Sequence, residues 1–269
     1  MLLLHLVQAI LLKNAVSPLT KISAIARAIC TADGISLQIS PSSAFGMVMA
    51  VLRINSSCFE DFRCDASVEG VDSLDLSVLN SILFVTNDRD SIIVTAYFDD
   101  DKTLIYFNFL DNTGFKLDCV PVALGIRTIE YKVPHPASTP DILGIKEPEY
   151  EYEVIVGIPS EEFRRVLRHL RLYEEYTVDV SVTDGRVVTF SSGSEHLDLT
   201  KENGCIFWGT EENDWVHFRI FLHGMNSFIE ASENSALVWM FKSPDSPAML
   251  NCPIGPLGNI KYYFSQDDY

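Results

Sequence analysis

Residues 25–39 have the sequence IARAICTADGISLQI, and residues 177–190 have the sequence TVDVSVTDGRVVTF. In both, an Asp-Gly pair (Asp33-Gly34 and Asp184-Gly185) separates two segments in which apolar and polar residues alternate. Asp-Gly between alternating segments is a strong signal for a tight β-hairpin, because such turns need residues that tolerate a positive φ. Positions 33 and 184 are 151 residues apart, which indicates an internal duplication.

The segments around the two hairpins follow one order, which supports the duplication. Each hairpin is preceded by one helical pattern and followed by a second, and then by a strand-like run. These segments are 9–22, 74–85 and 91–98 in the first copy, and 160–173, 216–231 and 236–241 in the second. We therefore predict an α+β fold made of two similar units with mostly antiparallel strands.

Three prolines within residues 133–141 indicate an extended connection between the two units, since proline removes backbone donors and stiffens the chain. We accordingly predict domains at 1–132 and 148–269, joined by a linker over 133–147.

The composition is that of a folded and strongly acidic protein. Of the 269 residues, 47% are hydrophobic and 21% are charged, which excludes a disordered chain. No apolar run reaches the roughly 20 residues of a membrane helix, and Met1–Leu12 lacks the basic flank of a signal peptide, so we expect a soluble protein. With 20 Lys+Arg against 37 Asp+Glu, the net charge of −17 on its own argues against a nucleic-acid partner.

The cysteines give no indication of a metal site. They are Cys30, Cys58, Cys64, Cys119, Cys205 and Cys252. They lack CxxC spacing and nearby histidine clusters, so we expect reduced and mostly buried thiols in a cytosolic or nuclear protein.

Known catalytic motifs are also absent from the sequence. It contains no GxSxG, no HExxH and no glycine-rich phosphate loop. The acidic runs at 99–101 and 147–149 could bind a metal, but isolated runs of this kind are usually solvated turns. We therefore predict no catalytic residues, no metal and no cofactor.

Residues 160–173 carry a high concentration of arginine for so acidic a chain. Ser160 is a favourable N-cap, and Glu161 and Glu162 suit the positive end of the helix dipole. An apolar face at i, i+3, i+4 and i+7 comprises Phe163, Val166, Leu167 and Leu170. The flank and the opposite face carry Arg164, Arg165, Arg168 and Arg171. This is either an ordinary solvated face or a surface for an anion such as a phosphate backbone, which would relieve repulsion among the arginines.

The sequence resembles the PCNA family of eukaryotic sliding clamps over most of its length. The matching stretches are Leu6-Val7-Gln8 with Leu12-Lys13, Gly34–Gln38 with Ser42-Ser43, Phe62–Asp65, Leu143–Tyr150, Ile158–Phe163, Met225–Phe228 and Gly258–Tyr263. They occur in the family's order and reproduce the internal duplication.

The resemblance implies two topologically similar sliding-clamp domains per chain, with three chains closed head to tail into a homotrimeric ring around duplex DNA. Antiparallel sheets form the outside and helices line the pore. Pairing of edge strands closes the ring, which implies a trimer interface at Ile129, Tyr131, Glu195, Leu197 and Leu199. The resemblance implies a nuclear protein that acts as a polymerase processivity factor and as a scaffold for replication and repair proteins. Its contacts with DNA phosphates are expected to be weak and independent of sequence, which lets the ring slide along DNA.

DNA-facing residues follow from the resemblance and from helical phase. The resemblance implies Lys13, Arg165, Arg168 and His223. Helical phase adds Lys21, Arg164, Arg171 and Arg219. The sequence departs from the family at Ser81, Phe84 and Glu230, where basic residues are expected, and Pro18 should end or kink the first helix. We therefore expect a pore that is basic mainly at the third helix.

The resemblance also implies a partner-binding pocket under the interdomain linker. The family's partners, including DNA polymerase and the clamp loader, carry a short motif with a Gln, an aliphatic anchor and two aromatic anchors. The matching pocket positions are Ser40, Ala44, Phe45, Met47, Leu143, Ile145, Pro247, Tyr263, Phe264 and Ser265. Ser40 and Phe45 differ from the family's usual residues, so we expect a reshaped pocket. Thr183 stands where the family has its regulatory lysine, so that modification is not possible here.

Three other functions stay open from the sequence. One is a subunit of a heterotrimeric DNA-damage checkpoint clamp, which predicts that the purified chain stays monomeric. The second is an enzyme that uses the acidic clusters with a metal. The third is a protein-interaction module without a DNA role, which predicts that charge reversal at Arg165 and Arg168 has no effect on DNA polymerase.

Overall fold

The computed structural model describes most of the chain. The described residues are 1–40, 47–64, 71–87, 90–99, 102–111, 116–117, 120–121, 126–133, 151–171, 177–209, 215–243 and 246–264. The chain divides into two compact units, which we treat separately. Unit 1 comprises Met1–Ile39, Leu52–Ile145 and Pro256–Gly258, and unit 2 comprises Ser40–Val51, Lys146–Gly255 and Asn259–Tyr269.

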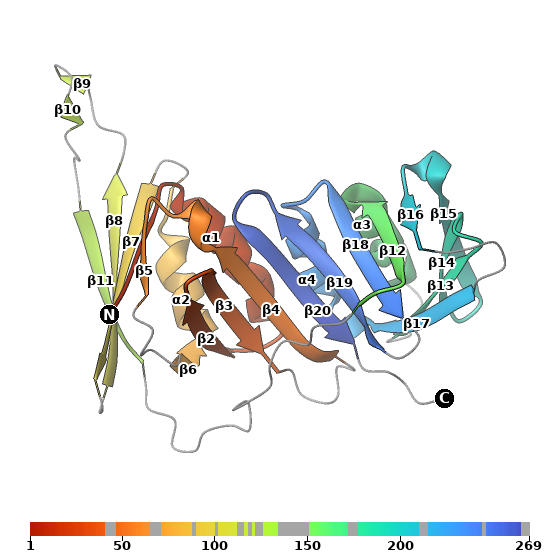
Figure 1. Cartoon of the computed structure of the whole chain (residues 1–269), viewed down its shortest axis with the longest axis horizontal. Coiled ribbons are helices and arrows are strands. Elements are labelled where there is room, and N and C mark those ends of the chain that lie inside the picture. The colour runs from red at the N-terminus through yellow and green to blue at the C-terminus, as the bar shows by residue number, and fades with distance from the viewer. Residues whose placement is uncertain are drawn as a thin grey trace. The chain divides into compact units, whose positions relative to one another are not determined.

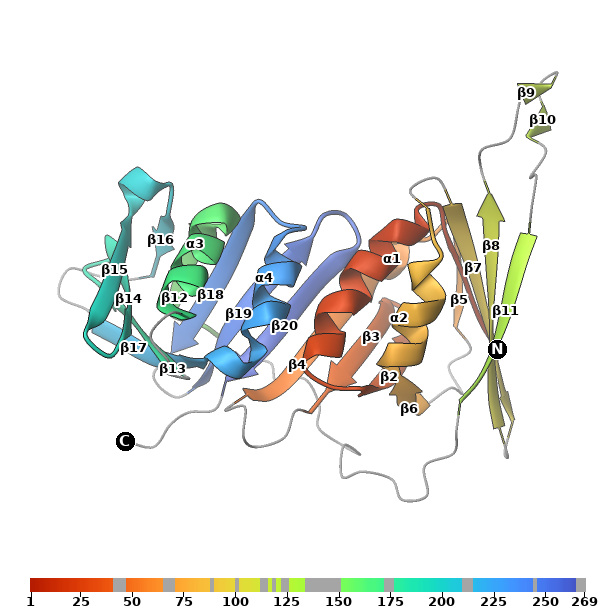
Figure 2. The ribbon, with the colours of Figure 1, turned by 180° about the vertical axis from the view of Figure 1, so that it is seen from behind.

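Unit 1 has two sheets and a pair of α-helices. Its elements are β1 (Leu2–Leu6), α1 (Ala9–Val16), η1 (Ser17–Lys21), β2 (Ile25–Thr31), β3 (Gly34–Ile39), β4 (Met47–Asn55), η3 (Ser56–Cys58), β5 (Asp61–Cys64), β6 (Val71–Asp75), α2 (Leu76–Phe84), β7 (Asp90–Asp99), β8 (Lys102–Asp111), β9 (Lys116–Leu117), β10 (Val120–Pro121) and β11 (Ile126–Val133). One sheet has the order β11-β8-β7-β1-β5, and the other contains β4-β3-β2-β6 (Figure 1). Helices α1 and α2 pack against each other on one side of the unit (Figure 2).

Unit 2 repeats this arrangement. Its elements are β12 (Val154–Pro159), α3 (Ser160–Leu170), β13 (Thr177–Thr183), β14 (Val187–Ser192), β15 (Glu195–Thr200), η5 (Lys201–Asn203), β16 (Ile206–Trp208), β17 (Trp215–Phe221), η6 (Leu222–Gly224), α4 (Met225–Ser232), β18 (Leu237–Ser243), β19 (Ser246–Ile254) and β20 (Gly258–Phe264). One sheet has the order β15-β14-β13-β17, and the other contains β16-β12-β18-β19-β20. Strand β4 is divided between the units, with Met47–Val51 in unit 2 and the rest in unit 1, and it is the neighbour of β20.

The duplication is visible strand by strand. The order β5-β1-β7-β8-β11 of unit 1 corresponds to β16-β12-β18-β19-β20 of unit 2, and β6-β2-β3-β4 corresponds to β17-β13-β14-β15. In both units the first helix follows the first strand, and the second helix precedes the last three strands of that series. The predicted α+β fold with two topologically similar units is therefore confirmed.

Hairpins form at both places, but only the second has its Asp-Gly pair within the turn. In the first, Thr31 pairs with Gly34, so Ala32 and Asp33 form the turn, and Gly34, with φ 145°, is the first residue of β3. A Cβ atom at Gly34 would lie 2.0 Å from the carbonyl oxygen of Ile54, so only glycine fits there. In the second turn Asp184 and Gly185 have φ 51° and 57°. This left-handed conformation explains why the sequence has these two residue types.

The predicted helix over 216–231 is wrong in its first half. Residues Trp215–Phe221 form strand β17, and only Met225–Ser232 are α-helical. Phe218 and Ile220 are buried, whereas Arg219 between them is only partly buried. This alternation has the period of two typical of a strand, and its aromatic and β-branched residues favour one.

The other predicted helices are shorter than expected. Helix α1 ends at Val16 and continues as a 3₁₀ turn with Pro18 near its start, which accommodates the proline. Helix α3 ends at Leu170. Pro159, not Ser160, holds its N-cap position, and Ser160 is a buried first-turn residue, so the predicted cap is wrong. Of the predicted linker, 134–147 lie outside the described residues.

The cores of the two units are predominantly apolar. Helix α4 packs on β20, where the Phe228 ring meets those of Tyr262 and Phe264 at centroid distances of 4.8 and 5.8 Å. The hydroxyl of Tyr262 is paired with that of Ser227 at 2.9 Å. The core of unit 1 contains a cavity of about 100 Å³ lined only by apolar side chains, such as those of Leu37 and Phe107. Such a cavity offers no partner for water.

The prediction of uniformly reduced thiols is wrong for one pair. Cys30 on β2 and Cys64 on β5 form a disulfide with Cα atoms 6.4 Å apart, because the fold brings these two strands together across 34 residues of sequence. Cys58, Cys205 and Cys252 are free, and the last two are buried. Burial raises the pKa of the Cys205 thiol to about 11, with a contribution from the nearby Glu162 carboxylate, and also raises the pKa of Cys252.

In the described part of the chain, no helix is long and apolar enough to cross a membrane. No group of three or more His, Cys, Asp or Glu residues is gathered there as a metal would require. Of the two acidic runs, 100–101 and 147–149 lie outside the described residues.

Candidate functional site

Helix α3 is strongly amphipathic, as the sequence predicts. Its apolar face is fully buried in unit 2 and comprises Phe163, Val166, Leu167 and Leu170. Glu161 and Glu162 lie in the first turn, and Arg168 with His169 in the last, so both ends carry charges that complement the helix dipole.

The four arginines of this region have two different roles. Arg164 donates through Nη1 to the carbonyl oxygen of Ser232 at 2.9 Å, and Arg171 donates to Oδ1 of Asn226 at 3.5 Å. Ser232 is the last residue of α4 and Asn226 is its second, so these two arginines contact α4 near both of its ends.

Arg165 and Arg168 are directed to solvent instead. Arg165 is exposed and forms an ion pair with Glu162, with 2.6 Å between Nη2 and Oε2. Arg168 is exposed and has no hydrogen-bond or ion-pair partner among the described residues. An exposed i,i+3 ion pair is worth only a few tenths of a kcal/mol, so it can open for an anionic ligand. These two guanidinium groups are therefore the ones best placed to bind phosphate.

The helices of unit 1 present a different surface. Helix α2 contains no charged residue, and its Ser81 hydroxyl donates to the carbonyl oxygen of Ser77. Phe84 at its end is 72% exposed. The ammonium group of Lys13 on α1 lies 4.8 Å from the centroid of the Phe84 ring, a cation–π contact. Lys21 is exposed at the end of η1. The helical layer of unit 1 is thus only weakly basic.

Two predicted DNA-facing residues precede α4 instead of lying on it. Arg219 lies on strand β17 directly opposite Asp179 of β13, with 2.8 Å between Nε and Oδ1. Its assignment by helical phase is therefore wrong, because the segment is a strand and the guanidinium is held by a carboxylate. His223 is exposed in η6. Glu230 is a partly buried residue of α4.

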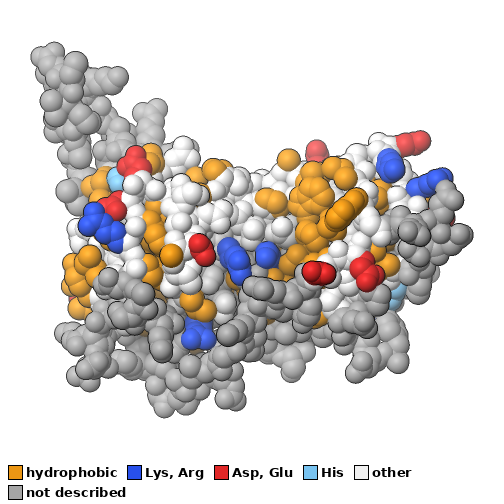
Figure 3. All heavy atoms as spheres, in the orientation of Figure 1, with side chains coloured by type: hydrophobic (Ala, Val, Ile, Leu, Met, Phe, Trp, Pro, Cys, Tyr) orange, Lys and Arg blue, Asp and Glu red, His pale blue; other side chains and the backbone are white. Residues whose placement is uncertain are grey.

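Part of the predicted partner pocket lies on the sheet face of unit 2 opposite α3 and α4. Tyr263 is buried there in a cluster with Met49, Val51 and Met249. Tyr152 and Phe241 pack against this cluster. Figure 3 shows hydrophobic side chains gathered on this face, with acidic side chains at its border. We call this group the outer cluster.

The other predicted pocket residues are placed less clearly. Pro247 on β19 is partly buried and Ser40 follows β3. Phe264 is 1% exposed and contacts Phe228 beneath α4, so it is a core residue and does not line the outer cluster. Neighbouring strand residues point to opposite faces, which is why Tyr263 and Phe264 separate. Met47 begins β4, and its side chain is outside the described part. Ala44, Phe45, Leu143, Ile145 and Ser265 lie outside the described residues.

The strands of the predicted interface lie at sheet edges. β11 is at one end of its five-stranded sheet and β15 at one end of its four-stranded sheet. Tyr131 and Leu199 are buried within their own units, and the Tyr131 hydroxyl accepts a hydrogen bond from the backbone N–H of Asp75. Ile129, Glu195 and Leu197 are partly buried.

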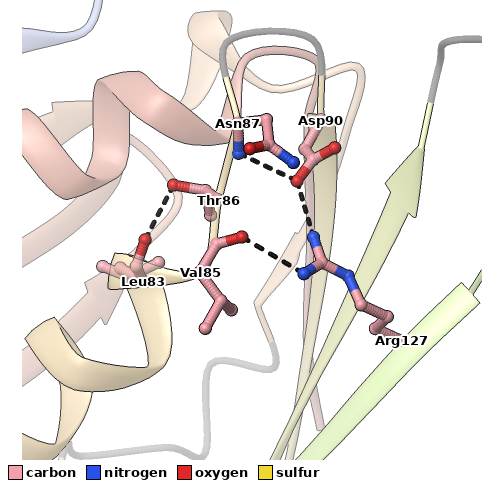
Figure 4. A network of polar contacts seen from close by, with 6 residues as sticks. All are labelled: Leu83, Val85, Thr86, Asn87, Asp90 and Arg127. Carbon is pink, nitrogen blue, oxygen red and sulfur yellow. Dashed lines mark hydrogen bonds and ion pairs between the residues drawn. The ribbon is translucent and has the colours of Figure 1, made fainter.

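Strand β11 is held in place by a polar network (Figure 4). Arg127 Nη2 lies 2.8 Å from Oδ2 of Asp90, a carboxylate that is 1% exposed. The Nη1 atom of Arg127 donates to the carbonyl oxygen of Val85 at 3.2 Å, and the backbone N–H of Asn87 donates to Asp90 at 3.0 Å. The network therefore links the edge strand to β7 and to the end of α2. The sequence analysis did not identify it, because only the folded sheet brings Arg127 and Asp90 together.

Comparison with known proteins agrees with this architecture. Residues 1–124 match the family described as "Proliferating cell nuclear antigen, N-terminal domain". The chain is 26% identical over 267 residues to "Proliferating cell nuclear antigen 2" of Drosophila melanogaster, which covers 97% of this chain and 95% of that relative. The duplicated α+β fold agrees with these matches to proteins of the DNA sliding-clamp class. Together they support a divergent, PCNA-like chain.

Proposed function

We propose that this protein is a sliding clamp that encircles duplex DNA, increases polymerase processivity and serves as a scaffold for replication and repair proteins in the nucleus. The observation that carries the proposal is the position of Arg165 and Arg168 on the solvent side of α3 in a chain with net charge −17. A clamp needs no catalytic group, because it acts by topological linkage to DNA.

The ring is proposed to form from three copies through the edge strands β11 and β15. Strand β4 is the neighbour of β20. In the duplicated topology β15 is the counterpart of β4, and β11 is the counterpart of β20. The same type of strand pair can therefore form between chains, with β15 of one protomer beside β11 of the next. Such pairing would also satisfy backbone groups that a free edge leaves open.

The charge distribution supports DNA in the pore despite the acidic total. Three copies carry a net charge of −51, which repels DNA from the outer surface. At physiological salt, charges beyond about 8 Å are largely screened, so DNA inside the ring responds mainly to the groups that line it. We assign the main contacts to Arg165 and Arg168, and weaker ones to Lys13, Lys21 and His223. Arg164 and Arg171 position α4, and Arg219 is assigned no DNA contact.

Polymerase, clamp loader and other partners are proposed to dock on the outer cluster through their short motif. Tyr263 and its three cluster neighbours are buried, so the aliphatic and aromatic anchors are proposed to contact the partly buried Tyr152 and Phe241 that pack against them. The family's motif supplies anchors of that kind.

The test is primer extension on a long single-primed template, with and without the clamp loader. We expect the wild-type protein to lengthen products only with the loader. The double variant Arg165→Ala/Arg168→Ala should lose most of this effect, about tenfold or more. The matched control is Arg53→Ala/Arg63→Ala, which removes the same charge from exposed positions on strands β4 and β5 and should behave like wild type. Equal losses in both variants, or no loader-dependent lengthening by the wild type, would refute the proposal.

A heterotrimeric checkpoint clamp is the second candidate, favoured by the uncharged exposed side of α2. It places this chain in a ring with two different subunits. Light scattering on the purified chain separates the two, because a homotrimeric clamp has three times the chain mass of 30.2 kDa and the checkpoint subunit alone remains at the chain mass.

A further inference from the structure

Strand β16, which is the end strand of its sheet among the described residues, exposes two large apolar side chains. Ile206 is 47% exposed and Trp208 is 68% exposed. Being two residues apart on a strand, they point to the same face of the sheet. Tryptophan is one of the residues that are enriched at binding hot spots.

The strand register places these residues in line with the outer cluster. Trp208 of β16 pairs with Ile155 of β12, and Ile155 pairs in turn with Phe241 of β18. Phe241 pairs with Met249 of β19, which belongs to the outer cluster. Directly opposed residues of antiparallel strands share one face. A continuous apolar row therefore runs from Met249 to Trp208 across β19, β18, β12 and β16.

A second row runs beside the first. Ile206 is opposite Gly157, and Gly157 is opposite Trp239. The Trp239 ring covers Gly157, where a Cβ atom would lie 2.8 Å from it. The Trp239 side chain therefore lies over β12, the strand between β18 and the β16 strand of Ile206. We call the two rows together with Tyr263 the outer track.

The border of the outer track is acidic. Glu151 and Glu153, just before β12, are both exposed. Figure 3 shows acidic side chains beside the hydrophobic patch on this face. The chain as a whole has a net charge of −17, so a second copy would meet like charge across this face. A partner with basic residues beside its apolar anchors is complementary to it.

We propose that the outer track binds an extended segment of a partner protein that has a second apolar anchor beyond the short motif, together with flanking Lys or Arg. This inference rests on the proposed docking function of the outer cluster and extends it to Ile206 and Trp208. Tyr263 on β20 and Trp208 on β16 are four strand spacings apart, or about 19 Å at roughly 4.8 Å per strand. An extended chain at about 3.3 Å per residue covers this in about six residues.

The probes are synthetic fluorescein-labelled peptides. A one-anchor peptide carries the Gln, the aliphatic and the two aromatic residues of the motif between lysines. Two-anchor peptides have an added Phe six residues before or six residues after the aromatic pair, at positions that are Ser in the one-anchor peptide. Fluorescence anisotropy gives Kd for the wild type, for Trp208→Ser and for the control Phe84→Ser. The Phe84 side chain is similarly exposed but lies in unit 1.

One two-anchor peptide should bind the wild type at least about tenfold more tightly than the one-anchor peptide, as expected for an aromatic anchor at a hot spot. Trp208→Ser should remove this gain and leave the one-anchor Kd unchanged, and Phe84→Ser should change neither. Equal Kd values for all peptides on the wild type, or a gain that persists in Trp208→Ser, would overturn the outer track. The proposal would also be overturned if the wild type self-associates, Trp208→Ser abolishes that association, and the two-anchor peptides bind no more tightly than the one-anchor peptide.

Primer extension with the clamp loader separates this inference from the proposed function. If loader-dependent extension is normal and no peptide binds, the outer track is refuted and the clamp function stands. If the two-anchor gain is found and extension fails, the track stands and the processivity function is refuted.

Discussion

Replacing Arg127 by Met should destabilise unit 1, because it leaves a buried carboxylate without its main partner. Asp90 is 1% exposed and lies 2.8 Å from Arg127 Nη2. The variant also removes the hydrogen bond from Arg127 to the carbonyl oxygen of Val85. Met keeps an apolar stem of similar length beside Phe109, over whose ring the guanidinium lies at 5.5 Å. The change therefore removes mainly the charge and its hydrogen bonds.

The magnitude follows from the burial of the two partners. Removing one member of a buried ion pair costs about 3–5 kcal/mol, and a hydrogen bond to a charged group is worth about 1.5–3 kcal/mol. The Arg127 side chain is 49% exposed, so water partly replaces it, and Asp90 still accepts a hydrogen bond from Asn87. We therefore expect a loss of about 2–3 kcal/mol, or about 4–10 °C in Tm for a chain of this size.

Urea denaturation and calorimetry measure this loss, with Arg63→Met as the matched control. Arg63 and Asp61 also form an arginine–carboxylate pair at 3.1 Å in unit 1, but their side chains are 66% and 40% exposed. The control should cost less than about 0.5 kcal/mol. Adding Asp90→Asn to Arg127→Met should restore part of the stability by removing the uncompensated charge. If both arginine variants cost the same, the reasoning from burial is refuted.

Two further predictions concern the first hairpin and the free thiols. Gly34→Ala should lower the free energy of unfolding by about 2 kcal/mol or more in chemical denaturation, because the added Cβ would collide with a backbone carbonyl. The control Gly255→Ala, at φ 49° with nothing within 4 Å of the added Cβ, should lower it by only about 1 kcal/mol. Equal losses would contradict the close approach at Gly34. Since the thiolate is the reactive form and burial raises the pKa of both thiols, Cys205 and Cys252 should resist iodoacetamide at pH 8.5 in the folded protein and react once it is unfolded in urea. Mass spectrometry measures the modification. In the folded protein, labelling of Cys205 should rise only as the pH approaches about 11. Rapid labelling of Cys205 at pH 8.5 would contradict its burial.

Local patterns in the sequence predicted the parts of the fold that depend on local chemistry. The second hairpin formed around Asp184-Gly185 because these residues adopt the left-handed geometry that the turn requires. The first turn lies one residue earlier than predicted, at Ala32-Asp33, so the sequence predicted its place but not its turn residues. Helix α3 formed because its apolar spacing matches one buried face. The segment 216–231 was misassigned because the alternation around Arg219 is short and adjoins a true helix.

The candidate sites depend more on long-range contacts, so the sequence predicted them less well. Helical phase placed four arginines together, but it could not distinguish those that bind α4, such as Arg164, from those that face solvent, such as Arg168. The separation of Tyr263 from Phe264 follows from strand alternation, which the sequence does show. The sequence does show Ile206 and Trp208 as large apolar residues with i, i+2 spacing between two glycines. The alignment of Trp208 with Met249, however, depends on the strand register.

The central claim is topological: the protein stays on DNA because a ring cannot leave a closed circle. The most direct measurement loads the protein with the clamp loader onto a nicked circular plasmid, isolates the complex by gel filtration, and then linearises the DNA with a restriction enzyme. We predict that the protein remains with the circular plasmid and is released when the plasmid is cut. Retention on the linear DNA equal to that on the circle, or failure to remain on the circle after loading, would contradict the account.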